Sequence, residues 1–579
     1  MLILGIHGDL FNKERLVFES NAALVKDGKL IAAVSEERLS RLKMDGRFPG
    51  ASIQDVLDKS GISMQEVDAI AIGGKKPLAS IAAYMKSAML TFFDTGVIAG
   101  NPVKAKKLLK GLSKKFSSKS SSGSATGINN FRFSSEPVFL DHHLCHVAGA
   151  YYASPFDDAL VLTLDGGGDG LDGTAYIAKG IRLEKIISIP HFQSPGTMYS
   201  AITHDMGFIR HRHEGKITGL AAYGKPSAEK LGLKNLLRYT SRKHRFIAPR
   251  IARHHRNLNT ISEYFGPLLK KFSREDLAAT VQHIFEEEIA AFAKDALETA
   301  RKKGFNSKNL CLAGGCFANV KLNQRLLEIT GIENVYVFPA MGDGGLAAGA
   351  AWQLYYQTGK RERDVSKLNH VYLGRSFTTE EMENALRSAG LKYEKPSDAE
   401  GEVARLLSDK KVVGRFDGAM EYGPRALGNR SILAAPFDAT INDWLNKKLR
   451  RTEFMPFAPS MTAEAAPEFL KGYRSDHIAC DFMTITYDIL PGMAEKIPAV
   501  VHVDNTARPQ VVHKEINPSY HKIIETFGKL TGVGVVLNTS FNIHEEPIVY
   551  TPQDAIKGFL DSKLDYLSMG PFLVKLPVE

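Results

Sequence analysis

The chain has 579 residues, too many for a single hydrophobic core, so two or three domains are expected. Apolar residues make up 44% and charged residues 24% of the chain, a balance typical of ordinary soluble proteins. The net charge of +10 and the pI of about 9.1 favour anionic ligands but do not require nucleic acid.

Cysteine usage and the most apolar stretch bear on the compartment. The cysteines form no CxxC pair, which predicts buried free thiols in a cytoplasmic protein; they are Cys145, Cys311, Cys316 and Cys480. Residues 1–5 enter a strand pattern without a basic start, so no signal peptide is predicted. Residues 81–100 are the most apolar stretch, but Lys86 and Asp94 interrupt it, so we predict a core helix and no membrane span.

The amino-terminal segment alternates short strands with turns. Residues 2–9 read as a strand, and Asp27-Gly28 is the kind of dipeptide that a tight hairpin turn requires. The polar run EERLSRLK, which ends at Lys43, fits either a solvated helix start or the edge of a site. Another strand is predicted over Val67–Gly73.

Much of the excess positive charge lies in residues 104–119 and 242–256, and from residue 104 to 130 the chain passes from lysine-rich to serine- and glycine-rich sequence. Such a composition buries too little apolar surface to fold alone, so we expect a mobile surface loop. Contact with lipid or nucleic acid is the alternative.

Residues 141–169 concentrate groups that could hold a metal and a phosphate. If this segment begins as a helix, His142 and His146 lie on one face. The apolar run that follows reads as a buried strand and delivers Asp165 at its carboxyl end. The three glycines 166–168 come next and suit a phosphate cradle. Each piece alone also fits structural histidines or a simple turn, but together they predict a nucleotide and a metal in one site.

Two further segments carry charge or form long helices. Glu214-Gly215-Lys216 places a carboxylate and an ammonium in a glycine-rich loop, where Lys216 could neutralise phosphate, although surface charge on a turn is the alternative. Residues 273–304 predict a packing helix, capped by Ser273 and ended by Gly304.

Glycine pairs recur at two later strand ends. Residues 309–315 read as a strand that runs into Gly314 and Gly315, with a helix starting near Phe317. Residues 338–349 repeat the pattern, with Asp343 before the glycines and a small-residue helix after them. Helix amino termini fed by glycines suit nucleotide phosphates and ribose.

A composition shift at residues 358–364 predicts a domain boundary near residue 360. Beyond it, a helix around 380–388 and the strand 411–418 lead into a Gly-Pro turn that is crowded by Arg415, Arg425 and Arg430. Arginine forks suit carbamoyl, carboxylate and phosphate oxygens. Polar tips of later β-branched runs, including DNTARPQ and LNTSFN, predict the lining of a pocket.

These residues together resemble the O-carbamoyltransferases related to the NodU and CmcH families, which include antibiotic-tailoring enzymes. The motifs that carry the resemblance span nearly the whole chain: EERLSRLK, HHLCH, LDGGGDG, EGKITGLAAYG, LCLAGGCFAN, GDGGLAAGAA, MEYGPRALGNRSI, PFAPS, DNTARPQ and LNTSFN. So many short motifs in order are highly specific.

The resemblance implies an α/β protein of two domains. Residues 1–360 would form an ATP- and metal-binding domain of the actin and sugar-kinase (ASKHA) type, close to the tRNA threonylcarbamoyl-transfer protein. Residues 361–579 would form a YrdC-like α/β domain. In such enzymes the carboxyl-terminal domain converts carbamoyl phosphate and ATP to carbamoyl adenylate, and the amino-terminal domain transfers the carbamoyl group to a hydroxyl.

Site residues follow from the resemblance, motif by motif. The implied metal ligands are His142, His146, Asp165 and Asp343. The metal is iron in the best-known relative, but this ligand set fits Fe(II), Mn(II) or Zn(II) equally. Residues implied around ATP and the carbamoyl adenylate are Lys43, Gly166, Gly167, Glu214, Lys216, Gly314, Gly315, Asn319 and Gly344. The residues implied around carbamoyl phosphate are Arg425, Arg430, Arg508 and Asn538. Of these, Arg425 and Arg508 are the expected catalytic groups. ATP with Mg²⁺ is the expected co-substrate.

The chain departs from the family pattern in two places. Relatives carry a contiguous HDASAAL-like motif whose histidine is thought to deprotonate the acceptor, but the aligned position here is Phe18. An extra segment separates His7 from the hairpin, and His7 is therefore the candidate base. Met455 stands where relatives usually have Arg, and Thr452 where they tend to have Glu.

The sequence thus predicts a carbamoyltransferase that uses carbamoyl phosphate and ATP and acts on a hydroxyl of a natural product, antibiotic or sugar. Modification of tRNA of the threonylcarbamoyl kind and a non-catalytic ATP-binding partner are the alternatives. No membrane partner is expected, and a homodimer is left open. The acceptor is not readable, because loops such as 210–213 and 242–256 follow no known pattern.

Overall fold

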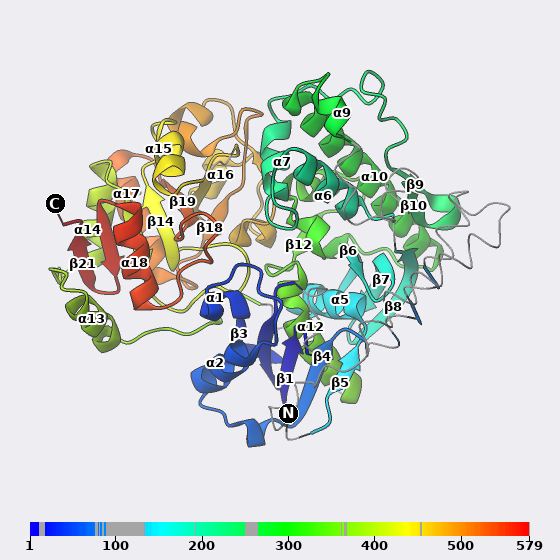
Figure 1. Ribbon diagram of the computed structural model, residues 1–579, viewed down its shortest axis with the longest axis horizontal. Coiled ribbons are helices and arrows are strands. Elements are labelled where there is room, and N and C mark those ends of the chain that lie inside the picture. The colour runs from blue at the N-terminus through cyan, green and yellow to red at the C-terminus, as the bar shows by residue number, and fades with distance from the viewer. Residues whose placement is uncertain are drawn as a thin grey trace.

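The structure is a computed structural model that describes residues 1–10, 18–75, 135–191, 193–248, 265–359, 368–451 and 454–577, with a few isolated positions between these ranges. Its described residues build three large sheets, which occupy separate regions of the molecule (Figure 1). The first two come from the amino-terminal part of the chain and the third from the carboxyl-terminal part. The predictions for residues 81–100 and 104–130 lie largely or wholly outside the described residues, as does Thr452.

The first sheet has the strand order β3-β2-β1-β4-β5. Its first three strands are antiparallel, whereas β4 and β5 continue from β1 in parallel. The β2–β3 turn is the expected Asp27-Gly28 hairpin, in which both residues have positive φ angles of 50° and 82°. The strands are β1 (Leu2–His7), β2 (Asn21–Lys26), β3 (Lys29–Ser35), β4 (Ala69–Gly73) and β5 (Val138–Leu140).

The second sheet repeats this pattern with the order β12-β11-β6-β7-β8. Here β6, β7 and β8 are antiparallel, and β11 and β12 continue from β6 in parallel. Two sheets with the same order and the same strand directions are the arrangement expected of the actin and sugar-kinase type, so the predicted α/β fold class is confirmed. The strands are β6 (Asp158–Gly168), β7 (Leu171–Lys179), β8 (Arg182–Pro190), β11 (Asn309–Ala313) and β12 (Asn334–Val337).

Helices α5 (His142–Ala153) and α12 (Leu346–Thr358) pack against each other, α5 on the second sheet and α12 on the first. The small-residue run at the start of α12 explains the close approach. A Cβ atom on Gly5 would lie 1.9 Å from the Ala347 carbonyl oxygen, and one on Gly349 would lie 1.9 Å from that of Cys145. This packing holds the ends of β1, β6 and α5 in one place.

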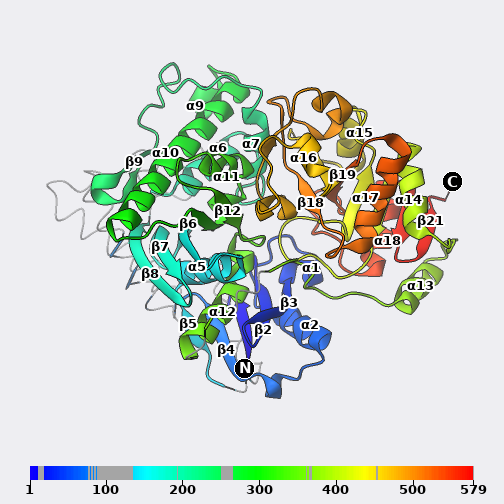
Figure 2. The same ribbon diagram turned by 180° about the vertical axis from the view of Figure 1, so that it is seen from behind.

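The third sheet is mixed and has the order β18-β15-β19-β14-β13-β20-β21, with α14 and α17 packed against each other beside it (Figure 2). Its strands are β13 (Val413–Phe416), β14 (Arg430–Ala434), β15 (Ala458–Thr462), β18 (Gln510–Val512), β19 (Val535–Ser540), β20 (Tyr566–Met569) and β21 (Phe572–Lys575). Two small ribbons complete the strands: β9 (Arg238–Thr240) with β10 (Arg245–Ile247), and β16 (Tyr487–Asp488) with β17 (Thr506–Ala507).

The remaining helices surround the three sheets. They are α1 (Glu36–Ser40), α2 (Gly50–Ser60), α6 (Pro195–Asp205), α7 (Glu214–Ala221), α9 (Gly266–Leu269), α10 (Arg274–Lys302), α11 (Val320–Leu327), α13 (Thr379–Ser388), α14 (Ala399–Ser408), α15 (Ile441–Lys448), α16 (Ala466–Phe469), α17 (Pro518–Thr531) and α18 (Pro552–Ser562). Helix α10 begins as predicted, because the Ser273 side chain accepts a hydrogen bond from the Asp276 N–H.

Two local predictions were wrong. Glu214 and Lys216 do not lie in a loop but open helix α7. Glycines 166–168 do not form a separate turn, because β6 continues through them to Gly168 and pairs with Leu171 after an irregularity in its register. The turn itself falls at Asp169-Gly170, where both φ angles are positive.

The described residues test the prediction for the cysteines. All four cysteines are free and buried, as expected from their spacing. Among the described residues, no helix is long and apolar enough to cross a membrane.

Candidate functional site

Two histidines and two aspartates meet where the two amino-terminal sheets face each other. The Asp141 side chain caps α5 by accepting a hydrogen bond from the Leu144 N–H at 3.1 Å, so the helix starts at His142. His142 and His146 then lie one turn apart on the same face. Asp165 arrives from β6, and Asp343 from the short 3₁₀ helix η6 (Asp343–Gly345).

The ligand atoms of these four residues all lie within 4.8 Å of one another. His146 Nε2 is 3.1 Å and His142 Nε2 3.6 Å from Asp165 Oδ2. Asp343 Oδ1 is 3.6 Å from His142 Nε2 and 3.7 Å from His146 Nε2. The structure therefore brings together all four residues that the sequence suggested as metal ligands.

The charges of this cluster call for a cation. Burial opposes a charge on His142, but Asp343 and Asp165 outweigh it and raise the pKa of His142 to about 9. Burial likewise opposes a charge on Asp165, but the neighbouring imidazoles of His142 and His146 lower its pKa well below the usual value. His142 Nε2 and Asp343 Oδ1 are buried without a hydrogen-bond partner among the described residues. Two imidazoles and two carboxylates with open ligand atoms fit a divalent transition metal.

Neighbouring groups orient the cluster. Asp169 Oδ2 accepts a hydrogen bond from the His142 backbone N–H at 2.9 Å. His143 points elsewhere, since its ring nitrogens contact Thr163 Oγ1 at 2.9 Å and the Leu171 carbonyl at 3.1 Å. The Asn21 side chain donates to the Asp343 carbonyl at 3.0 Å and accepts from the Ala347 N–H at 3.1 Å.

His7 lies beside this cluster at the end of β1. Its Nδ1 is 2.9 Å from the Gly73 carbonyl, which can only accept, so Nδ1 carries the proton and Nε2 has a free lone pair. His7 Nε2 is 3.9 Å from Asp343 Oδ2 and has no hydrogen-bond partner among the described residues. Burial lowers the pKa of His7, which favours the neutral form that a base requires.

Sequence reasoning missed Glu19 at this site. Its Oε2 accepts a hydrogen bond from the Gly344 N–H at 3.0 Å, and burial, with Glu37 and Asp343 nearby, raises the pKa of Glu19 to about 7. The residue stands next to Phe18, the position aligned with the family histidine. The only signal was its place just before the hairpin, which does not reveal the contact with residues 343–345.

The expected nucleotide-binding glycines divide into two groups. Gly166 and Gly315 adjoin Asp165: the Gly166 N–H donates to Asp165 Oδ1 at 2.6 Å, and a Cβ atom on Gly315 would lie 3.3 Å from the same oxygen. Gly167 and Gly314 instead allow close packing, because a Cβ atom there would lie 2.1 Å from the His191 ring and 2.2 Å from the Leu164 carbonyl oxygen. Gly344, as described, lies beside Glu19.

The polar residues expected near the nucleotide lie on and around α7. Glu214 accepts hydrogen bonds from Ser200 Oγ at 2.8 Å and the His211 N–H at 2.7 Å. Lys216 is buried, with its ammonium 5.4 Å from the Phe208 ring centre. Asn319 caps α11, and its Nδ2 donates a hydrogen bond of 3.3 Å to Thr218 Oγ1 on α7.

The expected carbamoyl phosphate residues surround the middle of the third sheet. Asn538 on β19 is buried between β14 and β15 and donates to the Ala426 carbonyl at 3.3 Å, next to the half-buried Arg425. Arg508 is half-buried two residues before the start of β18.

Arg430, in contrast, is fully buried at the start of β14, after the Gly-Pro turn that joins β13 to β14. It donates to the carbonyls of Asp417 at 2.7 Å and Asn429 at 3.0 Å, and it lies 3.9 Å above the Phe416 ring. Burial lowers the pKa of Arg430 to about 10, against the pull of Glu421 and Asp417. Its contacts are those of a residue that holds the turn in shape.

A second group of ligand-type residues joins the two parts of the chain: His213, His544 and Glu545. His213 Nε2 is 2.6 Å from Glu545 Oε1, and Arg212 Nη1 donates to Glu545 Oε2 at 2.9 Å. Arg212 also donates to the Lys43 carbonyl at 2.9 Å, so the backbone of Lys43 belongs to this contact.

The family departures also lie near this contact. The Phe18 ring stacks on His211 with 4.8 Å between ring centres. The backbone of Met455 packs on α7, where a Cβ atom on Gly219 would lie 2.7 Å from the Met455 nitrogen. Both residues therefore have structural contacts at the positions where the sequence was expected to depart from the family pattern.

Comparisons with known proteins cover both parts of the chain. The family model described as Carbamoyltransferase N-terminus matches residues 12–352, and that described as Carbamoyltransferase C-terminus matches residues 404–576. The chain is 35% identical to an uncharacterized protein of Synechocystis sp., over 96% of this chain and 95% of that protein. It is 32% identical to nodulation protein NolNO of Sinorhizobium fredii, over 99% of this chain and 82% of that protein. Full-length HypF, in its phosphate- and nucleotide-bound form, aligns with 62% of this chain and 47% of that chain at 12% identity and a TM-score of 0.33.

Proposed function

Because the chain belongs to the carbamoyltransferase family and is thus a transferase enzyme, we propose that it is an ATP-dependent O-carbamoyltransferase acting on a hydroxyl of a small molecule. The observation that carries the proposal is the convergence of His142, His146, Asp165 and Asp343 on one point, with His7 beside them. The four ligand residues lie in the part of the chain that the amino-terminal family model matches. Arg425 and Arg508 lie in the part that the carboxyl-terminal family model matches.

The first half-reaction belongs to the carboxyl-terminal sheet. Water releases phosphate from carbamoyl phosphate and leaves carbamate. A carbamate oxygen then attacks the α-phosphorus of ATP, a P–O bond breaks, and pyrophosphate leaves. Arg425 and Arg508 stabilise the phosphate charges as positioned guanidinium groups, and Asn538 contacts the carbamoyl group. Carbamoyl adenylate is the product.

The second half-reaction belongs to the histidine and aspartate cluster. His142, His146, Asp165 and Asp343 would hold a divalent cation, Fe(II) among those that fit, which when bound supplies Lewis-acid polarisation of the carbamoyl oxygen. Neutral His7 Nε2 accepts the proton of the acceptor hydroxyl. The hydroxyl oxygen bonds to the carbamoyl carbon, the bond from that carbon to the AMP oxygen breaks, and AMP leaves. Glycines 166 and 315 leave room for the nucleotide beside Asp165.

The proposal is tested by incubating the enzyme with carbamoyl phosphate, ATP and Mg²⁺ in the absence of acceptor. We expect release of phosphate and pyrophosphate, followed by carbamoylation when a cytosolic metabolite extract is added with ¹⁴C-labelled carbamoyl phosphate. Labelled product resistant to nuclease identifies a small-molecule acceptor. Absence of pyrophosphate release under metal-replete conditions would overturn the ATP-dependent mechanism.

A second candidate is tRNA modification of the threonylcarbamoyl kind, which the net charge of +10 favours. It predicts label in nuclease-sensitive material and tRNA binding that persists at moderate salt. Loss of tRNA binding between low and moderate salt, together with a labelled metabolite, would exclude it. The non-catalytic alternative is not retained, because the chain belongs to an enzyme family.

A further inference from the structure

A chain of buried hydrogen bonds fixes the orientation of two side-chain amides in the carboxyl-terminal sheet. Gln510 at the start of β18 is 2% exposed, and its Nε2 donates to the Leu427 carbonyl at 2.8 Å. A backbone carbonyl only accepts hydrogen bonds, so the opposite orientation of Gln510 would place two oxygens against each other. Gln510 Oε1 must therefore point away from Leu427.

The orientation of Gln510 in turn determines that of Asn538. Gln510 Oε1 accepts from Ser460 Oγ at 2.7 Å and from Asn538 Nδ2 at 2.9 Å. Asn538 Nδ2 also faces Ser460 Oγ at 3.1 Å. Because Gln510 presents an oxygen, Asn538 must present its nitrogen, and the assignment of both amides follows from the Leu427 carbonyl.

This arrangement leaves one acceptor unpaired. Asn538 is 1% exposed, and its Oδ1 has no hydrogen-bond partner among the described residues. A buried carbonyl oxygen without a donor is costly and is rarely retained without a ligand or function. The missing group must be an N–H or O–H donor.

The surroundings of Asn538 indicate what carries that donor. Its Nδ2 donates to the carbonyl of Ala426, the residue after Arg425, and Gln510 follows Arg508 by two positions. Two guanidinium groups thus stand in the chain segments that hold this amide. An anionic phosphate attached to a group with an N–H donor has the matching chemistry, and carbamoyl phosphate has both parts.

We propose that Gln510 is a positioning residue that holds Asn538 Oδ1 toward the NH₂ group of carbamoyl phosphate, so that the site selects against acyl phosphates without an N–H donor. This inference rests on the proposed function. Acetyl phosphate has a methyl group in place of NH₂ and would leave Asn538 Oδ1 unpaired. A site built around such a hydrogen bond discriminates strongly against the analogue that lacks it.

The test uses two stable inhibitors that differ only at this group: phosphonoacetamide, with NH₂, and 2-oxopropylphosphonate, with CH₃. Their inhibition constants are measured against carbamoyl phosphate in the pyrophosphate-release reaction of the full chain. We expect the wild-type protein to bind the amide about 10- to 100-fold more tightly. Equal constants would overturn the proposal without any variant.

The role of Gln510 is tested with Gln510→Leu, which keeps the approximate volume but frees the Asn538 amide to rotate. We expect the ratio of the two constants to fall toward one, while the constant of the ketone changes by less than about threefold. If both inhibitors bind more weakly by the same factor, so that the ratio of their constants stays at the wild-type value, Gln510 has only a structural role and the inference is contradicted. The matched control is Gln54→Leu, at an exposed glutamine of α2, which should leave both constants unchanged.

Thermal unfolding checks that the Gln510 variant folds. If Gln510→Leu does not fold, Gln510→Ala is measured in the same way, since the smaller side chain leaves space for water beside the Leu427 carbonyl. The outcomes also separate this inference from the proposed function. A wild-type protein that releases no pyrophosphate contradicts the function, whereas one that releases pyrophosphate but binds both inhibitors equally contradicts only the role of the amides.

Discussion

Two groups of histidine and acidic residues in this molecule have similar composition but opposite states of pairing. In the first, His142 Nε2 and Asp343 Oδ1 are buried without hydrogen-bond partners, and among the described residues no arginine or lysine pairs with either aspartate. In the second, Arg212 and His213 both bind Glu545. The first group needs a cation, whereas the second already contains one.

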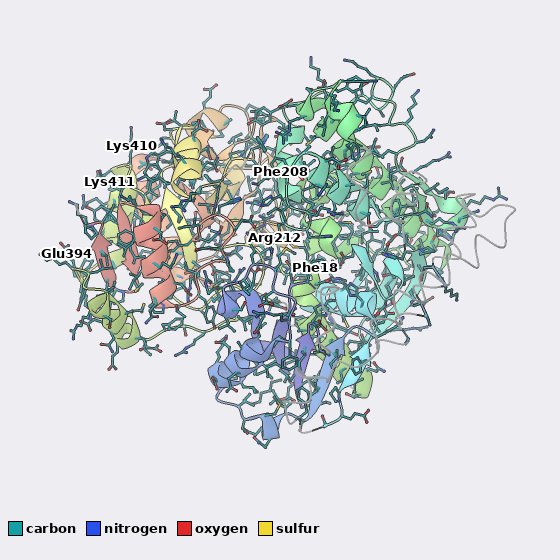
Figure 3. All side chains as sticks on the ribbon, in the orientation of Figure 1. Phe18, Phe208, Arg212, Glu394, Lys410 and Lys411 are labelled. Carbon is teal, nitrogen blue, oxygen red and sulfur yellow. The ribbon has the colours of Figure 1, made fainter. Side chains whose placement is uncertain are left out.

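Proton placement shows the same difference. The Ile209 N–H donates to His213 Nδ1 at 3.2 Å, so Nε2 carries the proton and donates to Glu545 Oε1. A metal would need that nitrogen unprotonated. His213, His544 and Glu545 therefore form a polar contact between the two parts of the chain. Figure 3 shows Arg212 in the middle of the molecule, whereas Glu394, Lys410 and Lys411 lie at its outer flank. Residue types within reach of one another thus do not define a metal site; open lone pairs and unbalanced charge do.

The strongest test of this comparison removes one ligand from each group. For His146→Ala we expect loss of the bound metal and a fall in carbamoyl transfer of at least about a hundredfold. Replacing a residue that only hydrogen-bonds to a metal ligand already lowers metal affinity or activity about 10- to 100-fold. Pyrophosphate release should remain, because it belongs to the other sheet. Metal is measured by elemental analysis and transfer with labelled carbamoyl phosphate.

The matched control is His213→Ala, which should keep the wild-type metal content. Arg425→Ala provides the opposite control and should keep the metal but lose pyrophosphate release. Equal metal loss in the two histidine variants, or unchanged metal in His146→Ala, would contradict the distinction between the groups.

Metal removal from the wild-type protein should have an intermediate effect. Two aspartates and two histidines held together without a cation destabilise the folded state, so chelation should lower the thermal midpoint by several degrees. Re-addition of Fe(II), Mn(II) or Zn(II) should restore it, and calorimetry follows the change. The Asp343→Asn variant has less negative charge to balance, so chelation should lower its thermal midpoint by less. A decrease as large as in the wild type would indicate that the chelator removes metal from another site.

The smallest expected effect concerns the contact between the two parts of the chain. Hydrogen bonds from His213 and Arg212 outweigh the opposing effect of burial and lower the pKa of Glu545 to about 2, below its ordinary value of 4.5. A lowered carboxyl pKa stabilises the folded state fully above pH 4.5, and this stabilisation is lost as the pH falls toward 2. Glu545→Gln should therefore reduce the free energy of unfolding by up to about 1 kcal/mol near pH 6.

Chemical denaturation of the wild type and of Glu545→Gln at several pH values measures this difference. It should shrink as the pH falls, because the wild-type carboxyl then also loses its charge. A difference that does not depend on pH would mean that Glu545 contributes by packing alone. Glu525→Gln, at an exposed pair with Lys529 on α17, is the control and should change the stability little at any pH.

Much of the candidate site could be predicted from local sequence because its geometry is local. The spacing of His142 and His146 places them on one helix face once Asp141 caps the helix. The glycines 166–168 directly follow Asp165, but they were expected in a loop. Pairing with β7 extends the strand through them, and such pairing depends on a neighbour that a single-strand pattern does not contain. The domain boundary near residue 360 and the roles of the site residues stay predictions.

Local sequence patterns did not predict the contacts of Glu19, Lys43 and Glu545. The contact of Glu19 with Gly344 and that of Arg212 with both Lys43 and Glu545 join segments far apart in the chain. Nothing in the local pattern of either partner specifies such a contact. The same holds for Lys216, whose helical environment and place above Phe208 followed only from packing.

By itself, the sequence determined which side chains could bind a cation, which turns required glycine, and which family the motifs resemble, since these depend on residue type and short spacing. Only the tertiary structure decided which histidines keep open lone pairs, that the ring nitrogens of His213 are occupied by Ile209 and Glu545, and that the side-chain oxygen of Asn538 is left without a donor. The reason is physical: charge balance, burial and hydrogen-bond pairing are properties of all the neighbours of a group, and most of those neighbours come from other parts of the chain.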